Sequence, residues 1–237
     1  MLVKRVLNFF DRMNGRRNGK YSYSQCGEDL IVRHIFDSLK KDKITYLDVG
    51  AHHPFHLSNT AFFYQSGSRG INIEPNPFLF NEFKQWRGND INLNIGVGTE
   101  SAHLDFYVMD SPLLSTFSEI EAKNLVHTYN RKIERKFPVS VLPISSIIEE
   151  YSSSSFPDFL SLDVEGLDEA IIKSLPLNNY KPAVICVETI SYSQSRAGVK
   201  NNEILEYLKA NNFLVYADTY INTIFVDREV WERGFIA

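Results

Sequence analysis

The chain has 237 residues, which is enough for one large domain with a sizeable hydrophobic core. Its net charge of −4 and its pI near 5.9 give no reason to expect nucleic acid as a partner. No apolar run approaches the roughly 18 residues that a membrane span requires. Cys26 and Cys186 have no Cys-x-x-Cys spacing and no signal peptide before them, which indicates a reducing, cytoplasmic setting.

Residues 1–20 form the first predicted element, a basic amphipathic helix that we treat as an extension of the main domain. Asp11 is the one acid among several lysines and arginines, and the apolar side chains fall on one side at about 100° per residue. Two interpretations stay open. The helix docks on the domain or on a second subunit of a homo-oligomer, or it makes peripheral contact with an anionic membrane at its inner face.

From residue 43 onward, short apolar runs alternate with segments of helical period, which predicts a parallel sheet with crossover helices. The fold class is therefore α/β, a doubly wound, mostly parallel seven-stranded sheet with helices on both faces. The last strand is expected to be antiparallel because little chain precedes it. Residues 101–109 and 138–144 alternate as a hairpin or an insertion, and an irregular region is expected at about 105–140. The predicted strands are 44–50, 71–75, 91–98, 159–166, 183–189, 213–220 and 222–231, and the predicted helices are 58–67, 76–87, 167–175 and 202–212.

Polar residues or glycines follow five of the predicted strands. In an open parallel sheet these positions meet at one edge, where ligands bind. A single acid at a strand end is usually a helix cap or a turn former, but five in succession favour a binding site. These residues are Asp48, Gly50, Glu74, Asn94, Gly96, Asp163, Glu165 and Glu188.

The residues at the first two strand ends favour a nucleoside as the ligand. Gly50 allows close approach to the backbone, and Glu74, 24 residues later, stands where a carboxylate takes both ribose hydroxyls. The loop at 50–55 reads GAHHPF and lacks the G-x-G-x-x-G of a pyrophosphate dinucleotide site. S-adenosylmethionine fits this pattern, with its charged end near Asp48 and its adenine near the third strand end.

Several segments together resemble the FkbM family of S-adenosylmethionine-dependent methyltransferases. The resemblance covers about residues 21–227 and implies a class I methyltransferase (Rossmann-like) fold over a domain at 21–237. It implies O-methylation, typically of a sugar in polysaccharide biosynthesis (a surface glycan, a lipid-linked or a nucleotide-sugar intermediate) or of a natural product. Acceptor choice would reside at 111–137. The segments are YSQCGED (23–29), DVGAHHPFHLSNTAFFYQSG (48–67), GINIEPNP (70–77), LNIGVG (93–98), LDVEG (162–166) and VICVE (184–188).

The same resemblance assigns cofactor contacts residue by residue. Asp48, Gly50, Ala51 and Glu74 would contact S-adenosylmethionine. Gln25 and the turn that contains Asn59 match family motifs that lie near the cofactor.

A sugar hydroxyl is a weak acid, so its methylation needs a base or a metal ion. Asp163 and Glu165 are two residues apart and would share a face of a continuing strand. With Glu188 from the neighbouring strand they would act as bases. Alternatively, Asp163 and Glu188 would bind Mg²⁺.

The histidines after the first strand are the second set of candidate bases. His52 and His53 are the candidates there, with His56 nearby, because histidine is the commonest base at neutral pH. Their crowding into five residues makes a zinc site improbable. Simpler roles remain for two residues: Glu165 would cap the next helix, and His53 would shape the turn before Pro54.

Three other functions compete with sugar methylation. The chain would methylate a non-sugar natural product, act as an NAD(P)-dependent nucleotide-sugar enzyme, or keep the fold as a catalytically silent binding module. The absence of the dinucleotide motif G-x-G-x-x-G argues against the NAD(P)-dependent enzyme. Binding of S-adenosylmethionine would argue against the silent binding module.

Overall fold

The computed structural model describes residues 21–152, 155–164, 166–178, 181–190 and 198–234. The predicted helix at 1–20 and the candidate Glu165 lie outside the described residues. None of the helices within these ranges is long and apolar enough to cross a membrane.

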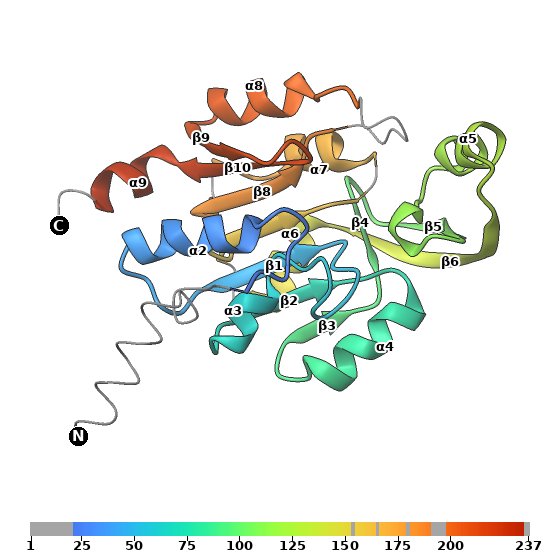
Figure 1. Cartoon of the computed structure of the whole chain (residues 1–237), viewed down its shortest axis with the longest axis horizontal. Coiled ribbons are helices and arrows are strands. Elements are labelled where there is room, and N and C mark those ends of the chain that lie inside the picture. The colour runs from blue at the N-terminus through green and yellow to red at the C-terminus, as the bar shows by residue number, and fades with distance from the viewer. Residues whose placement is uncertain (1–20, 153–154, 165, 179–180, 191–197, 235–237) are drawn as a thin grey trace, which may run out of the picture.

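The main element is a seven-stranded sheet with the strand order β3-β2-β1-β7-β8-β10-β9 (Figure 1). Strands β1, β2, β3, β7 and β8 pair in parallel, and β10 is antiparallel to both β8 and β9. The order reverses between β1 and β7, so the doubly wound sheet and its antiparallel last strand are confirmed. The strands are β1 (Thr45–Val49), β2 (Arg69–Ile73), β3 (Ile91–Leu93), β7 (Phe159–Leu162), β8 (Val184–Glu188), β9 (Phe213–Asp218) and β10 (Asn222–Asp227).

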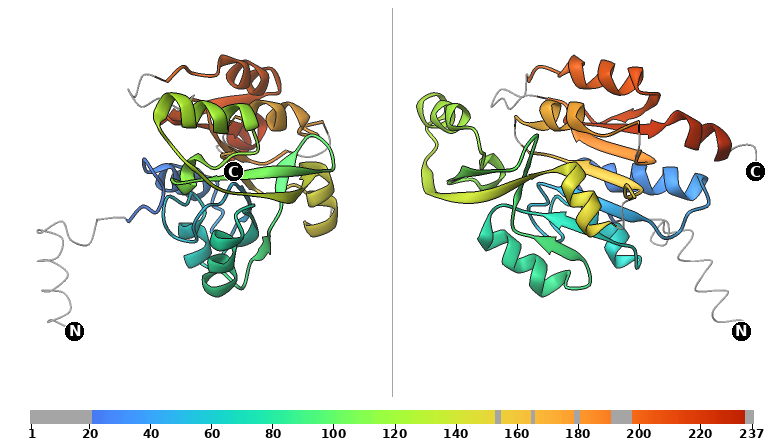
Figure 2. Two further views of the ribbon diagram at one scale, coloured as in Figure 1. Left: turned by 90° about the vertical axis from the view of Figure 1, so that its right-hand side faces the viewer. Right: turned by 180° about the vertical axis from the view of Figure 1, so that it is seen from behind.

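Helices cover both faces of this sheet because its central strands carry apolar side chains on both sides. Along β1, Tyr46 packs with the cluster beneath α2 and α3, whereas Leu47 and Val49 join the larger cluster beneath α6, α7 and α8. Figure 2 shows α6 and α7 on the rear face. The helices are α2 (Glu28–Ser38), α3 (Ala61–Gln65), α4 (Pro77–Trp86), α6 (Ile144–Tyr151), α7 (Asp168–Ser174), α8 (Asn202–Ala210) and α9 (Arg228–Gly234).

A small three-stranded sheet in the order β4-β6-β5 stands beyond the carboxyl ends of the parallel strands (Figure 1). It consists of β4 (Gly96–Gly98), β5 (Ala102–Met109) and β6 (Ile133–Pro143), and β5 and β6 pair antiparallel as the hairpin interpretation predicted. The expectation of an irregular region at 105–140 is wrong. Between these strands lie the short helix η1 (Pro112–Leu114) and α5 (Glu119–Tyr129).

Three predicted strands end four or more residues earlier than expected. The strand at 91–98 divides into β3 and β4 because the Asn94 side chain donates hydrogen bonds to the carbonyls of Glu74 and Pro75 and turns the chain away. The strand at 159–166 ends at Leu162, where the Val164 amide bonds to the Asp168 carboxylate instead of a neighbouring strand. The last strand ends at Asp227, and α9 follows it.

Side-chain hydrogen bonds fix the starts of two predicted helices. The Asn76 side chain accepts the Phe78 amide at 3.1 Å, and Pro77 occupies the first helical position of α4. The Ser58 hydroxyl accepts the Ala61 amide at 3.1 Å ahead of α3. These two turns fix the loop after β1 and the loop after β2 at the carboxyl edge of the sheet.

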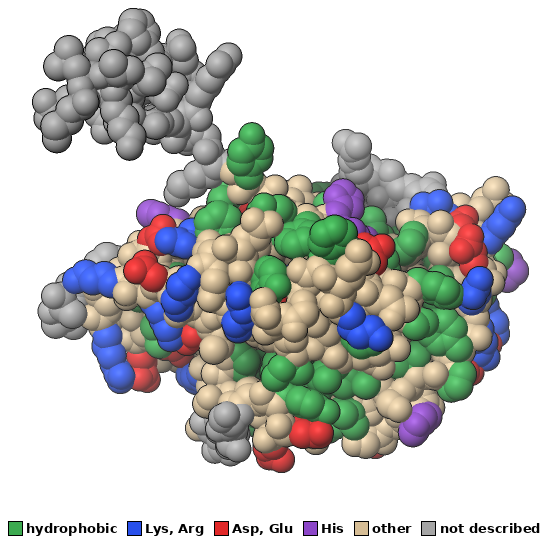
Figure 3. Space-filling model, turned by 90° about the horizontal axis from the view of Figure 1, so that it is seen from below, with side chains coloured by type: hydrophobic (Ala, Val, Ile, Leu, Met, Phe, Trp, Pro, Cys, Tyr) green, Lys and Arg blue, Asp and Glu red, His purple; other side chains and the backbone are tan. Residues whose placement is uncertain are grey.

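The surface carries both signs of charge. On the face in Figure 3, Lys and Arg side chains are interspersed with Asp, Glu and apolar side chains, and the described residues of that face form no basic stripe. This distribution agrees with the mildly acidic composition.

Candidate active site

A cavity lies where the carboxyl ends of β1, β2 and β7 face the small sheet. Its empty volume is about 610 Å³, a figure that includes open solvent at its mouth. Val49, Gly50 and His52 form one part of its wall, and Glu74 and Asp163 supply carboxylates. The topological switch between β1 and β7 therefore holds the cavity, where an open α/β sheet is expected to bind its ligand.

Gly50 makes the turn that closes this cavity from below. Its φ is +75°, and a Cβ there would overlap the backbone carbonyl oxygen of Asp163. The amides of Gly50 and Ala51 both donate to the Ile73 carbonyl, at 3.1 and 3.0 Å. The glycine is therefore required by the close approach of the chain after β7, as well as by any ligand above it.

Replacing Gly50 by alanine is expected to lower the free energy of unfolding by about 2 kcal/mol or more, because strain at positive φ adds to the overlap with Asp163. Gly27 offers a matched control, since its φ is +90° but a Cβ there meets nothing within 4 Å. Urea denaturation of both variants measures the difference. Equal losses of stability would show that the overlap with Asp163 costs nothing.

The Glu74 carboxylate lies in the cavity with acceptor positions to spare. It is 5% exposed and lines the cavity. One oxygen accepts the His52 amide at 2.8 Å, and the other accepts the Asn76 amide at 2.7 Å. A carboxylate oxygen has two lone pairs, so each oxygen keeps one acceptor position. Burial raises the pKa of Glu74 to about 8, and hydroxyl donors would favour its ionised form.

Asp48 lies outside the cavity wall. Its side chain points to the same face of β1 as Tyr46, and it accepts a hydrogen bond from the Thr60 hydroxyl at 2.5 Å. Arg87, fully buried, donates to that same hydroxyl at 2.9 Å and pairs with Asp90 at 3.0 Å. Burial raises the pKa of Asp48. The carboxylate thus ties the start of α3 to β1 beneath the loop that contains Gly50.

Asp163 brings the second carboxylate to the cavity. Its pKa is raised to about 7, first by burial and then by the negative charges of Asp168, Asp48 and Glu28. The structure adds Asp168, which the sequence analysis missed. This residue is buried, its carboxylate accepts the Val164 amide at 3.1 Å, and burial raises its pKa to about 6. An Asp four residues after Val164, at the start of a predicted helix, was the available signal.

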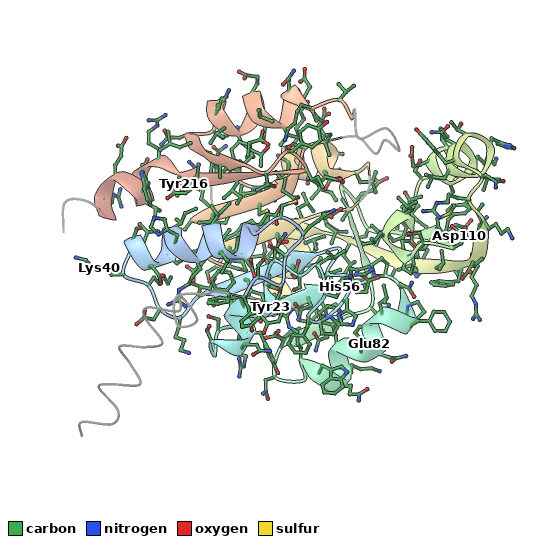
Figure 4. All side chains as sticks on the ribbon, viewed as in Figure 1. Tyr23, Lys40, His56, Glu82, Asp110 and Tyr216 are labelled. Atoms are coloured by element: carbon green, nitrogen blue, oxygen red, sulfur yellow. The ribbon has the colours of Figure 1, made fainter. Side chains whose placement is uncertain are left out.

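The two histidines have different surroundings. His52 lines the cavity, its Nδ1 is buried without a partner among the described residues, and burial lowers its pKa to about 4. The Nδ1 of His53 accepts the amides of Phe55 and His56, at 3.0 and 2.9 Å, as the turn-shaping interpretation predicted. Its Nε2 lies 3.1 Å from Glu82 of α4. His56 and Glu82 are labelled in Figure 4.

Three other predicted contacts lie at or near the cavity. Gly96 lines it, and a Cβ there would overlap the ring of Phe117. Ala51 is buried directly after Gly50, and Asn94 holds the chain between β3 and β4 through its two carbonyl bonds. These residues shape the wall on the side of β2 and the small sheet.

Two predicted contacts lie farther away. Gln25 is exposed ahead of α2 and is not part of the cavity wall. The Asn59 side chain donates to the Ser161 hydroxyl at 3.2 Å and to the Cys186 sulfur at 3.7 Å. Asn59 therefore joins the loop after β1 to β7 and β8.

The carboxylates proposed for Mg²⁺ do not form a cluster. Asp163 lines the first cavity, whereas Glu188 lines a second cavity beyond β8. Within the described residues, no group of three or more His, Cys, Asp or Glu side chains is placed to hold a metal ion. The structure therefore gives the proposed Mg²⁺ site no support.

The small sheet supplies an apolar side of the cavity that the sequence analysis missed. The rings of Phe106 of β5 and Phe117 contact each other in a tilted arrangement with their centroids 4.8 Å apart, and both line the cavity with Leu79 of α4. The alternation at 101–109 was a signal for a strand. Nothing in it indicated that the strand would face the main sheet edge.

Stability is expected to fall as the pH rises from about 5 to 8. Glu74, Asp163 and Asp168 have pKa values of about 8, 7 and 6, raised from 4.5, 3.8 and 3.8. In this range the folded chain holds protons that the unfolded chain has released, so the free energy of unfolding decreases with pH. One such group changes it by about 1.4 kcal/mol per pH unit.

Urea denaturation at pH 5, 6.5 and 8 measures this dependence. The Glu74→Gln variant should show a smaller decrease toward pH 8, because it lacks the carboxyl with the highest pKa of the three. A free energy of unfolding that is constant or rises over this range would contradict the assignment.

Comparison with known proteins identifies the family. Residues 48–215 match the family described as the methyltransferase FkbM domain. No curated protein matches the chain.

The chain is also similar to several solved structures at low sequence identity. The methyltransferase FkbM of Methylobacillus flagellatus KT is 13% identical with a TM-score of 0.44, and the match covers 78% of this chain but only 44% of that protein. A putative caffeoyl-CoA O-methyltransferase from Staphylococcus aureus is 9% identical with a TM-score of 0.46, and the match covers 96% and 100% of the two chains. A TehB-like S-adenosylmethionine-dependent methyltransferase from Corynebacterium glutamicum is 10% identical with a TM-score of 0.42, and the match covers 94% and 98%. The family match over residues 48–215, more than half of the chain, shows that this chain belongs to the FkbM methyltransferase family.

Proposed function

We propose that the protein is an S-adenosylmethionine-dependent O-methyltransferase that methylates a sugar hydroxyl. The observation that carries the proposal is the placement of two carboxyls, those of the buried Glu74 and the partly exposed Asp163, on one cavity at the topological switch of the sheet. One has the free lone pairs that a ribose diol needs, and the other has a pKa of about 7. Family membership supports methyl transfer as the reaction.

The wall of this cavity suits the parts of the cofactor. Glu74 would accept the ribose hydroxyls, and the turn at Gly50 would lie beneath the amino-acid portion. Apolar side chains such as Val97 of β4 and Phe117, which lies between η1 and α5, would pack against the adenine. Bound S-adenosylmethionine supplies an activated methyl group on a positively charged sulfur.

Asp163 is the residue best suited to take the proton of the acceptor hydroxyl. Its pKa of about 7 makes it partly ionised at neutral pH and a stronger base than an ordinary carboxylate. His52 lines the same cavity, but its pKa of about 4 makes it a much weaker base. The side chain of His53 is engaged in its own turn and with Glu82.

Two observations test the proposal. In a thermal-shift assay, S-adenosylmethionine should raise the melting temperature, whereas NAD should not. Mass spectrometry of sugars and glycans incubated with the protein and isotopically labelled S-adenosylmethionine should show the gain of one methyl group. If only non-sugar hydroxyls gain a methyl group, the acceptor is a natural product and not a sugar. If NAD alone raises the melting temperature, the proposal is overturned.

A further inference from the structure

The His52 side chain has an unused hydrogen-bonding atom in the wall of the proposed cofactor cavity. His52 lines this cavity together with Gly50, Glu74 and Asp163. Its Nδ1 is buried and has no hydrogen-bond partner among the described residues. Buried polar atoms in folded proteins nearly always have a partner, so an unpaired nitrogen in a cavity wall points to a ligand that supplies one.

The backbone fixes the place of this side chain. His52 has a φ of +54°, and its amide donates to one oxygen of Glu74 at 2.8 Å. Gly50, two residues earlier, has a φ of +75° and belongs to the same turn. His52 therefore connects the turn at Gly50 to Glu74, the two places proposed for the amino-acid portion and the ribose of the cofactor.

The unpaired nitrogen is a hydrogen-bond acceptor. Burial, with the nearby His53 and His56, lowers the pKa of His52 to about 4, so at neutral pH the ring is uncharged and carries one N–H. A hydrogen bond to the backbone of His56 favours the charged ring, as a bond to a carbonyl does. Because Nδ1 has no partner, that bond uses Nε2, which then carries the proton. A lone pair is left on Nδ1.

The donors of the cofactor indicate what this lone pair binds. S-adenosylmethionine and S-adenosylhomocysteine both have ribose hydroxyls, an adenine amine and an α-ammonium group. The ribose hydroxyls would use the free positions of Glu74, and the adenine would lie against Val97 and Phe117. The α-ammonium group belongs to the portion over Gly50, two residues from His52, and it is the donor that still lacks a partner.

Resting on the proposed function, we infer that Nδ1 of His52 accepts a hydrogen bond from the α-ammonium group of the cofactor. An ammonium group has three donors, so Nδ1 shares it with the carboxyl groups near this wall. These are Asp163, which lines the cavity, and Glu165, which lies outside the described residues. The uncharged nitrogen orients the ammonium group without adding a negative charge to the wall. His52 is then a cofactor-binding residue and not the base of the reaction.

Calorimetry with two ligands tests this contact in the full-length protein. The ligands are S-adenosylhomocysteine and its desamino analogue, in which hydrogen replaces the α-amino group. His52→Leu removes the lone pair, whereas His52→Asn keeps an acceptor near the position of Nδ1 and tolerates the positive φ. His52→Leu should bind S-adenosylhomocysteine about 10- to 100-fold more weakly than the wild-type protein, because a hydrogen bond to a charged group is lost. Its affinity for the analogue should stay within about threefold, and His52→Asn should recover most of the loss.

A measurement on the wild-type protein covers the case in which His52→Leu does not fold. In protein with nitrogen-15-labelled histidine, the Nδ1 resonance of His52 should move upfield when S-adenosylhomocysteine binds, because a hydrogen bond to the lone pair shields this nitrogen. The desamino analogue should move it much less.

The outcomes separate this inference from the proposed function. Unchanged binding of S-adenosylhomocysteine in His52→Leu, equal weakening toward both ligands, or an Nδ1 resonance that responds equally to both would overturn the inference. Each of these results leaves the methyltransferase assignment intact, since each concerns a protein that binds the cofactor. Absence of stabilisation of the wild-type protein by S-adenosylmethionine would overturn the proposed function itself.

Discussion

Replacing Asp163 by asparagine is expected to lower kcat about 10²- to 10⁴-fold, because the variant lacks the base that takes the hydroxyl proton. The side chain keeps its size, so the dissociation constant of S-adenosylmethionine should change less than about threefold. Single-turnover kinetics with labelled cofactor measure the loss of rate, and isothermal titration calorimetry measures the dissociation constant of S-adenosylmethionine.

The pH dependence separates a base from a residue that only shapes the site. In the wild-type protein, kcat should rise between about pH 6 and 8, because Asp163 loses its proton with a pKa of about 7. The residual activity of Asp163→Asn should lack this rise. His52→Gln serves as the comparison, since a histidine with a pKa of about 4 does not titrate in this range. If the rise disappears in His52→Gln and persists in Asp163→Asn, the roles must be exchanged.

Replacing Glu74 by glutamine is expected to weaken binding of S-adenosylmethionine about 10- to 100-fold. The variant keeps one carbonyl oxygen but replaces the other by a donor, which is unable to accept either the backbone amide or a ribose hydroxyl. Calorimetry measures the dissociation constant. Glu82→Gln on α4 is a suitable control, because Glu82 contacts His53 outside the cavity wall.

A cofactor analogue without ribose hydroxyls makes this prediction specific. The wild-type protein should bind S-adenosylhomocysteine much more tightly than its 2′,3′-dideoxy analogue, and Glu74→Gln should discriminate far less between them. If the variant is weakened equally toward both compounds, Glu74 supports the fold of the loop without contacting the ribose.

The sequence predicted the main sheet well because the fold depends on patterns that a single chain displays. The buried strands β1, β7 and β8 read as apolar runs, and Asn76 with Pro77 marks the start of α4. Strand ends were less predictable. The chain leaves the sheet after Leu93 because the Asn94 side chain bonds to two carbonyls, and this contact joins residues about 20 positions apart.

The candidate site was predicted in part, because strand ends meet at one edge whatever the details of the loops. Glu74 and Asp163 do line one cavity. The direction of Asp48 was not anticipated, although the alternation along β1 places it with Tyr46 on the opposite face from Val49. The contribution of Phe117 depends on how the chain between β5 and β6 folds back over the sheet edge, and no local pattern specifies that.

A crystal structure of the protein with S-adenosylhomocysteine tests the proposed cofactor site most directly. We expect the nucleoside in the cavity between β1, β2 and β7, with both ribose hydroxyls within hydrogen-bond distance of the Glu74 carboxylate. A nucleoside bound elsewhere, or a diol that lies away from Glu74, would contradict it.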